Sequence, residues 1–367
     1  MPDAELVERA KLLLDRLCQK PRFAGSLEEA AAREICKGEL QGAGFACREL
    51  LFEYSQSPGR WGPVLAAALQ AATIILVARM AMYGGPLAAL VVGGALVIAL
   101  FFVEAYAKRW LILDFPSQRA RSVNLEARRG TPHVWLVAHL DSKAQTVSML
   151  VRIAGSIGLA AVMALTTVLL LLSLIGVESC AGLWHGVQGA AIVAAIPGLA
   201  SLVVNVSPGA VDNASGVVAA ILAAGSAEAP KDLGVLITSG EELGLAGARV
   251  WAAGASTEFR ILNCDTIDDE GDWRCMYSST NPEVITGRTK GVAYRLGLRL
   301  RVTRLIPGIL ADNIPFADRG IGAVTLSRGT LSTLARIHTR RDTSKALTGK
   351  GAAEASALLS ALAKELA

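Results

Sequence analysis

Long apolar runs interrupt an otherwise mixed pattern of hydrophobic and polar positions. Residues 61–82 contain a single charge, Arg79, and residues 86–103 contain none. Residues 153–177 also lack charges, and a less hydrophobic uncharged segment covers 186–206, with Pro197 inside it. Apolar runs of about 20 residues can cross the hydrocarbon core of a bilayer as helices. The pattern therefore predicts about four transmembrane helices in two hairpins, with a buried core helix as the alternative for the fourth.

Outside these runs, short apolar strand patterns alternate with helical patterns. Strands are expected at 133–141, 233–240, 258–266 and 321–329, and helices are expected to begin near Asn213, Leu243, Thr289 and Asp312. This alternation is typical of an α/β fold with a largely parallel sheet and helices on both faces. The prediction is one catalytic domain, formed by residues 1–60, 108–146 and 207–367, with transmembrane hairpins inserted at 61–107 and 147–206.

Composition agrees with a membrane protein. Of the 367 residues, 52% are hydrophobic and only 19% are charged, which is too apolar for an ordinary soluble domain. The formal charge of +4 is spread along the chain without a basic block, so no nucleic-acid partner is expected. The 6 cysteines form no Cys-x-x-Cys pair, and reduced thiols are expected. The amino-terminal segment resembles an amphipathic helix without an apolar signal core, which predicts no export by a cleaved signal.

The cations beside the hairpins indicate their orientation. The flanks on the catalytic side carry Arg60, Lys108, Arg109, Arg119, Arg121, Lys143 and Arg152, whereas the hairpin tips offer only Arg79. Lysine and arginine are enriched on the cytoplasmic side of membrane proteins. We therefore expect a multi-pass protein of the cell inner or plasma membrane, with the catalytic domain and both termini in the cytoplasm and Cys180 at an outer tip.

Polar side chains follow several of the expected strands. In "AHLDS", His139 and Asp141 lie at alternate positions. This spacing is typical of a metal ligand with its supporting carboxylate, and it also suits a hydrogen-bonded structural histidine. Asp212 in "PGAVDNASG" is either a ligand or an ordinary helix cap. Glu241 and Glu242 in "GEELGLAG" are either residues of a first helical turn or a general base beside a metal ligand.

Two further motifs complete this series. Asp265 lies in "LNCDT" and His338 in "RIHTRRDT", and these motifs contain two of the chain's 4 histidines. Sites in parallel sheets gather at the carboxyl ends of the strands. In chain order, the series supplies nitrogen and oxygen donors for two zinc-like ions that share one carboxylate.

The motifs "AHLDS", "PGAVDNASG", "GEELGLAG", "NCD", "ADNIPFADRGIGA" and "IHTRRDT" together resemble the family-28 metallopeptidases. These are co-catalytic zinc aminopeptidases whose relatives include glutamate carboxypeptidase and glutaminyl cyclase. The segment "KPRFAGSLEEAAAREICKGELQGAGF" is similar to their opening helices, so the resemblance covers essentially everything outside the hairpins. It implies a zinc aminopeptidase-like fold, two bound Zn²⁺ ions and cleavage of peptides.

The resemblance also implies a role for each residue of the series. One zinc is held by His139 and Asp265, the other by Glu242 and His338, with Asp212 as the bridge. Glu241 is then the general base, Asp141 orients His139, and the Asp212–Asn213 peptide is cis. In "ADNIPF", Asn313 stands where the family often has histidine or tyrosine, which leaves substrate contacts open, while Asp312 either supports the site or caps a helix.

The leading functional hypothesis is a membrane-bound aminopeptidase that hydrolyses short peptides with metal-activated water. The alternatives are hydrolysis or cyclisation of another amide, such as an acyl amino acid or an amino-terminal glutamine, and a noncatalytic scaffold, which predicts eroded ligands. The expected partners are the peptide substrate and the lipid bilayer. Because His139 precedes the third apolar run by 14 residues and Asp212 follows the fourth by 6, we also expect the metal site to lie near the membrane.

Overall fold

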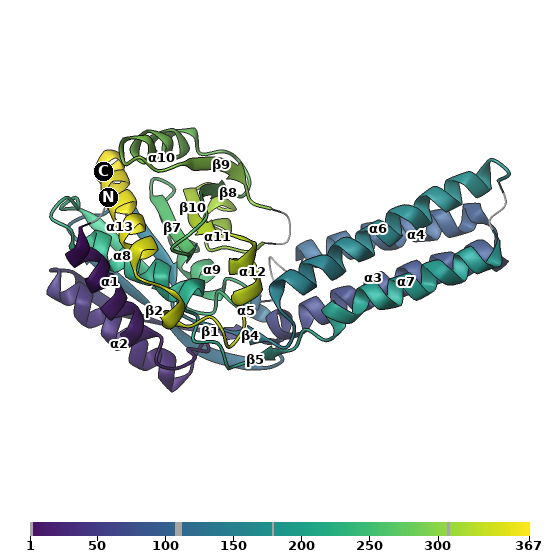
Figure 1. Ribbon diagram of the computed structural model, residues 1–367, viewed down its shortest axis with the longest axis horizontal. Coiled ribbons are helices and arrows are strands. Elements are labelled where there is room, and N and C mark those ends of the chain that lie inside the picture. Colours follow the sequence, from purple (N-terminus) through teal and green to yellow (C-terminus); the bar gives the residue numbers. More distant parts are fainter. Residues whose placement is uncertain (1–2, 107–111, 178–179, 307–308) are drawn as a thin grey trace. The chain divides into compact units, whose positions relative to one another are not determined.

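The computed structural model describes residues 3–106, 112–177, 180–306 and 309–367 (Figure 1). The chain divides into two compact units. Unit 1 contains Met1–Tyr54, Arg119–Ala144 and Val204–Ala367, and unit 2 contains Ser55–Gln118 and Gln145–Val203. Residues 55–60, assigned from the sequence to the catalytic domain, fall in unit 2, because the first long helix already starts at Ser57 with Pro58 in its first turn.

Unit 1 is built on an eight-stranded sheet in the order β1-β2-β6-β3-β7-β10-β8-β9. The strands are β1 (Ala46–Ser55), β2 (Arg119–Arg129), β3 (Val134–His139), β6 (Leu233–Thr238), β7 (Arg260–Ile267), β8 (Asp272–Tyr277), β9 (Leu300–Arg304) and β10 (Gly322–Gly329). The central strands β6, β3, β7 and β10 run parallel to their neighbours within this group. In contrast, β2 is antiparallel to β6, and β8 is antiparallel to β10. The predicted α/β fold with a largely parallel sheet is confirmed.

Sequence reasoning located the central strands and missed the outer ones. The expected strands coincide with β3, β6, β7 and β10, of which β3 and β6 are completely buried. By contrast, β2, β8 and β9 contain charged residues and are only partly buried. A long apolar run identifies a strand covered on both faces, whereas a strand near a sheet edge lacks this signal. A separate two-stranded sheet pairs β4 (Ala144–Gln145) with β5 (Val203–Val204).

Helices cover both faces of the large sheet. One layer contains α1 (Ala4–Leu17), α8 (Ser215–Gly225) and α13 (Lys350–Leu366), which contact one another, with α2 (Leu27–Gly42) and α10 (Glu283–Arg295) beside them (Figure 1). The shorter α9 (Ala246–Ala252) and α11 (Asn313–Ala317) contact each other and the sheet. The remaining helical turns of this unit are η2 (Ala210–Ala214), α12 (Leu331–Arg336) and η3 (Ser344–Ala346). The helix expected near Thr289 begins earlier, at Glu283, because Pro282 with its fixed φ precedes the first turn.

An aromatic cluster fixes α9 and α11 on the sheet. Trp135 of β3, which is completely buried, packs against Trp251 of α9 with ring centroids 4.7 Å apart. Trp251 in turn packs against Phe316 of α11 at 5.8 Å. Aromatic pairs of this geometry stabilise by about 0.5–1.5 kcal/mol beyond their area of burial. The cluster therefore fixes α9, which follows β6, and α11, which precedes β10, on the sheet.

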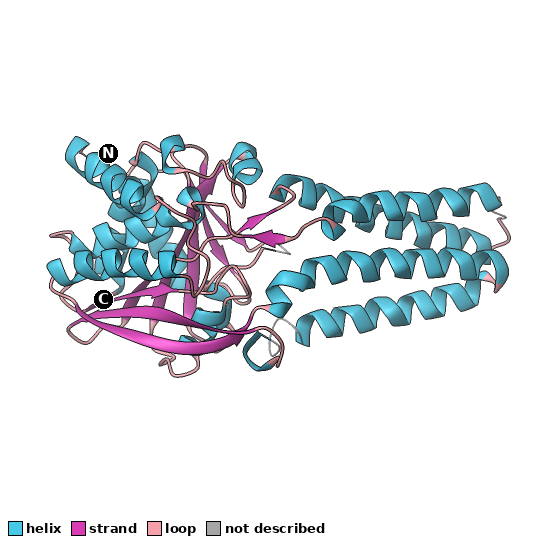
Figure 2. Ribbon diagram, turned by 90° about the horizontal axis from the view of Figure 1, so that it is seen from below, coloured by secondary structure: helices cyan, strands magenta, loops and turns pink. Residues whose placement is uncertain are grey.

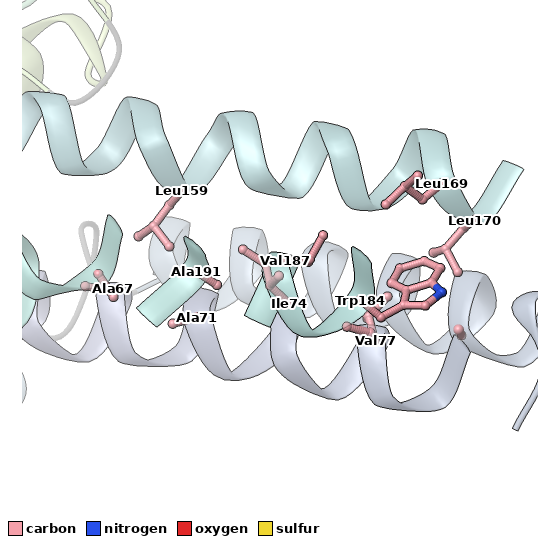
Figure 3. Packing of buried hydrophobic residues seen from close by; sticks show 13 residues of the cluster. Ala67, Ala71, Ile74, Val77, Leu159, Leu169, Leu170, Trp184, Val187 and Ala191 are labelled. Carbon is pink, nitrogen blue, oxygen red and sulfur yellow. The ribbon is translucent and has the colours of Figure 1, made fainter. Parts of the chain in front are cut away.

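Unit 2 is a bundle of four helices (Figure 2). They are α3 (Ser57–Tyr83), α4 (Pro86–Tyr106), α6 (Met149–Leu174) and α7 (Ala181–Leu199), with the short α5 (Ile112–Asp114) after α4. The two predicted hairpins pack on each other, since α3 contacts α7 and α4 contacts α6. The interior contains small and branched residues, among them Ile74 and Val77 of α3, together with Trp184 of α7 (Figure 3).

The outer surface of unit 2 is apolar. Exposed leucine, valine, isoleucine and phenylalanine side chains occur along all four helices; on α4 they include Val91, Ile98, Phe101 and Phe102. Within the described residues, three helices are long and apolar enough to cross a membrane: Ser57–Tyr83, the Pro86–Val103 part of α4, and Met149–Leu174.

Three of the about four predicted spans are therefore found among the described helices. The fourth helix, α7, forms where the sequence predicted it and has 19 residues, but it is less apolar than the other three. Its glycines, together with His185 and Gln188, lower its hydropathy. Two of the flanking cations, Lys108 and Arg109, lie outside the described residues.

Candidate metal centre

The predicted site residues come together at the carboxyl ends of the central strands. His139 is the last residue of β3, Asp265 lies near the end of β7, and the Glu241–Glu242 pair follows β6. Asp212 lies in the turn before α8, and His338 lies just after α12. All of these side chains are buried, as is Asp141. Positions separated by up to 199 residues, from His139 to His338, thus form one cluster.

One group of donors surrounds the Nε2 atom of His139. Asp212 Oδ1 lies 3.3 Å from this nitrogen, Asp265 Oδ1 lies 3.6 Å away, and Glu241 Oε2 lies 3.8 Å away. The potential ligand atoms of His139, Glu241 and Asp265 are all within 4.8 Å of one another. We call His139 and Asp265, with the Asp212 oxygen that faces them, the first donor group.

A second group of donors surrounds the Nε2 atom of His338. Asp212 Oδ2 lies 3.0 Å from this nitrogen, and Glu242 Oε2 lies 3.1 Å away. The ligand atoms of Asp212, Glu242 and His338 also lie within 4.8 Å of one another. We call Glu242 and His338, with this Asp212 oxygen, the second donor group. The two carboxylate oxygens of Asp212 therefore face different histidines, as a bridging ligand requires.

The loop that carries Asp212 is fixed by Asp342 and Asn213. The carboxylate of Asp342 accepts hydrogen bonds from the backbone N–H groups of Val211 and Asp212 at 2.8 and 3.1 Å. The Asn213 side chain donates to the Cys264 carbonyl at 2.8 Å, next to the ligand candidate Asp265. The Asp212–Asn213 peptide is cis, which confirms the prediction. Asp212 makes no side-chain cap to α8, so its interpretation as an ordinary helix cap is wrong.

The two glutamates lie in a loop and not in the first turn of a helix. The helix α9 begins only at Ala246, after Leu245 with a positive φ of 62°. The carboxylate of Asp141 accepts the backbone N–H of Glu241 at 3.2 Å and that of Glu242 at 3.1 Å. The interpretation as helix-dipole residues is therefore wrong for this pair, and its conformation depends on a buried carboxylate from another strand end.

Asp141 contacts His139 mainly through its backbone. The Nδ1 atom of His139 lies 3.0 Å from the Asp141 carbonyl oxygen and 3.7 Å from the Oδ1 carboxylate oxygen. The side chain is instead aligned with the N–H groups of the two glutamates. The geometry therefore gives Asp141 a positioning role toward the glutamate loop that the sequence did not indicate.

Comparisons with known proteins agree with this geometry. Residues 198–363 match the sequence profile of peptidase family M28. This part of the chain carries the sequence pattern of the family. Among solved structures, it is similar to a zinc aminopeptidase from Bacillus subtilis, with a TM-score of 0.57, 14% identity, and coverage of 98% of this chain and 95% of that one. No curated protein sequence matches the chain.

Two further solved structures have the same fold. An aminopeptidase from Aneurinibacillus sp. strain AM-1 has a TM-score of 0.56 at 14% identity, covering 97% of this chain and 92% of that one. A glutaminyl cyclase from Fimbriiglobus ruber has a TM-score of 0.55 at 14% identity, covering 98% of this chain and 94% of that one. The fold of the M28 chain is thus shared by enzymes of more than one activity.

Electrostatics of the M28 site favour bound cations. Burial raises the pKa of Glu241 well above its usual range, and the nearby charges of Glu242 and Asp265 raise it further. Burial alone would lower the pKa of His338, but the contacts with Glu242 and Asp212 raise it to about 9. Without metal, these surroundings favour protons on Glu241 and His338, and divalent ions can replace that positive charge.

The donor set fits zinc. Each donor group offers one imidazole nitrogen together with carboxylate oxygens, which are ligand types that zinc accepts. The Nε2 atom of His139 is buried and forms no well-oriented hydrogen bond within the described part of the chain, although three carboxylates lie within 4 Å of it. A bound cation would give this buried nitrogen a partner and would offset the charges of the carboxylates around it.

Asp312 supports the site and does not cap its helix. It occupies the N-cap position of α11 but makes no side-chain cap. Its Oδ2 atom accepts a hydrogen bond from Thr238 at 2.5 Å, and Thr238 pairs with His139 across β6 and β3. Burial raises the pKa of Asp312 to about 7. The helix-cap interpretation is therefore wrong, and the contact with Thr238 is the one that support of the site would require.

Lys143 has a position that the sequence did not indicate. It was counted among the flanking cations, but its side chain is only 14% exposed and its Nζ lies 2.9 Å from Oε2 of Glu242. A lysine two residues after "HLD" gives no sign of this contact, because the contact depends on how the glutamate loop folds back. Similarly, only the structure shows that Asp342, within the quoted "IHTRRDT", holds the Asp212 loop.

Proposed function

We propose that this M28 protein is a membrane-bound dinuclear zinc aminopeptidase that hydrolyses the amino-terminal residues of short peptides. The observation that carries the proposal is the pair of buried donor groups meeting at Asp212, with Glu241 beside them. In this proposal His139 and Asp265 hold one ion, Glu242 and His338 hold the other, and Asp212 bridges them. Two zinc ions there would polarise the scissile carbonyl and lower the pKa of the attacking water.

Glu241 is the proposed general base. Its carboxylate faces the first donor group, where Oε2 lies 3.8 Å from His139 Nε2. It would accept the proton of the attacking water as the oxygen adds to the peptide carbon. The same carboxyl group would then give that proton to the leaving amine nitrogen while the C–N bond breaks. In the metal-free protein burial and the charges of Glu242 and Asp265 raise the pKa of Glu241, and the positive charge of bound ions would lower it, which would leave the carboxylate free to accept the proton.

The remaining residues of the site keep these groups in place. Asp141 fixes the glutamate loop through two backbone N–H groups, and Asp342 fixes the loop of Asp212 in the same way. Reacting groups need such fixed positions because misplacement by about 1 Å can reduce rates a hundredfold. A noncatalytic scaffold is disfavoured, since it gives no reason for all the donors and their supports to be present.

A membrane location is part of the proposal. Three helices are long and apolar enough to span a bilayer, and the exposed side chains of unit 2 are largely apolar. Such a surface is unfavourable in water and favourable against lipid tails. The cations beside the hairpins favour an orientation with the M28 unit and both termini in the cytoplasm.

The proposed base is tested with Glu241→Gln in the purified full-length protein. The isosteric amide cannot accept the proton, so kcat should fall by about 10²–10⁴-fold while the zinc content measured by elemental analysis stays unchanged. Glu258→Gln, the same change at an exposed position, is the matched control and should retain full activity. Activity retained in Glu241→Gln would remove the base assignment.

Cyclisation of amino-terminal glutamine, or hydrolysis of another amide, is the second candidate. It is favoured by the similarity to a glutaminyl cyclase at the same 14% identity as the aminopeptidases. A panel of peptides with free, acetylated and glutaminyl amino termini separates these activities. Cleavage restricted to free amino termini supports the aminopeptidase, whereas loss of ammonia from glutaminyl peptides without cleavage would replace it with the cyclase.

A further inference from the structure

Lys143 lies against only one of the two donor groups. Its Nζ is 2.9 Å from Oε2 of Glu242 and donates a hydrogen bond to the Glu242 carbonyl at 2.5 Å. Its backbone N–H donates to Oε1 of the same carboxylate at 3.2 Å. Both carboxylate oxygens of Glu242 therefore contact Lys143, and Oε2 is also the oxygen that faces His338.

The first donor group has the opposite surroundings. Here the additional neighbour is an acid, because Oε2 of Glu241 lies 3.8 Å from His139 Nε2. Asp265 has a neutral hydrogen-bond donor, the Thr266 hydroxyl, at 3.0 Å. Apart from the shared Asp212, two carboxylates thus surround the first group, whereas in the second the ammonium of Lys143 offsets the single carboxylate of Glu242.

We propose that Lys143 makes the two donor groups bind divalent cations with unequal affinity, the first group tightly and the second weakly. The inference rests on the proposed dinuclear site. A cation in the second group has to share Glu242 with an ammonium group, and two positive charges in a buried region repel each other strongly. Lys143 is therefore a positioning residue that fixes the Glu242 carboxylate and lowers the affinity of the ion bound there.

Unequal loading has a functional consequence. At low zinc concentration the protein holds one ion, in the first group beside Glu241, and the second group fills only as the concentration rises. The activity of the M28 site would then follow zinc availability over the range in which the second group fills. Lys143, and not the donor residues themselves, would determine that range.

Zinc titration of the full chain tests this proposal. The purified protein in detergent is freed of metal with a chelator and titrated with Zn²⁺ by calorimetry. The expected result is two separate binding steps for the original protein. In Lys143→Met the second step should tighten by about tenfold or more, because a nearby unit charge is removed, while the first step stays the same. Lys143→Arg keeps the charge and should keep the weak second step.

Control variants assign the steps to the donor groups. Asp265→Asn should remove the tight step, and Glu242→Gln should remove the weak one. Lys364→Met removes a lysine from the exposed Lys364–Glu228 pair and should change neither step. An unchanged first step in Lys143→Met shows that this variant is folded.

The remaining outcomes would overturn either the role of Lys143 or the proposed function. Two equal steps in the original protein, or an unchanged second step in Lys143→Met, would overturn the role of Lys143 while leaving the dinuclear site intact. Loss of both steps in Lys143→Met would also overturn it, because the residue would then be needed for the structure of the site. Absence of any zinc binding in the original protein would instead contradict the proposed function.

Discussion

Replacing Asp141 with asparagine perturbs the glutamate loop without changing the shape of the side chain. The buried carboxylate of Asp141 accepts two backbone N–H groups, those of Glu241 and Glu242, at 3.2 and 3.1 Å. An asparagine has only one acceptor oxygen, so its NH₂ group would face the other N–H group. One hydrogen bond to a charged acceptor is lost, and one buried donor is left unsatisfied.

The expected cost follows from these two contacts. A hydrogen bond to a charged group contributes about 1.5–3 kcal/mol, and an unsatisfied buried donor costs about 1–3 kcal/mol. Asp141→Asn should therefore destabilise the closed conformation of the loop by at least about 2 kcal/mol. This corresponds to a change of about thirtyfold or more in the equilibrium between closed and open loop.

Hydrogen exchange of the metal-free full chain measures this change directly. Amide exchange in the segment 237–249 should accelerate by about thirtyfold or more in Asp141→Asn. Asp15→Asn, at a partly exposed surface ion pair, is the control and should leave this segment unchanged. If exchange were unchanged while zinc binding at His139 weakened, Asp141 would act by orienting the histidine, and the positioning role toward the glutamates would be refuted.

Three further outcomes are expected. In the metal-free protein the neighbouring carboxylates raise the pKa of His338 to about 9 and that of His139 well above its usual range, so zinc must displace protons from both; zinc affinity measured by calorimetry should therefore increase from pH 7 to about 9, and a flat profile would contradict this. Gly155→Ala would place its Cβ 2.9 Å from a backbone oxygen and should lower the melting temperature in detergent, whereas Gly94→Ala, with open space around it, should not; equal effects would argue against the packed bundle. In intact cells an impermeant maleimide should label the exposed Cys180 but not an introduced Lys364→Cys, and the reverse pattern would invert the orientation.

The ligand candidates could be predicted because each follows an apolar strand or precedes a helix at a motif position. His139 and Asp265 belong to strands that are buried on both faces, which is the strongest pattern that a sequence offers for a parallel sheet. The carboxyl ends of such strands meet in space, so distant positions could be assigned to one site. The family resemblance then supplied their roles.

What could not be predicted depends on the directions of individual side chains. The sequence places Lys143 beside a hairpin, but only the fold of the glutamate loop brings Glu242 within 2.9 Å of its Nζ. The carboxylate of Asp141 is two residues from His139, yet it bonds to an N–H group 100 residues away. Such contacts are set by tertiary geometry and leave no periodic signal in the chain.

The position of β3 in the sheet has a consequence for synthesis of the protein. This strand is made before α6 and α7, but its two neighbours in the sheet, β6 and β7, are made after them. At about 5–20 residues per second, the ribosome needs several seconds to proceed from His139 to the end of β7. During this time a strand that is completely buried in the folded protein has neither of its partners, and unpaired strands of this kind aggregate readily. In the proposed membrane location, early insertion of the helices into the bilayer would keep nascent chains apart until β6 and β7 are made and pair with β3.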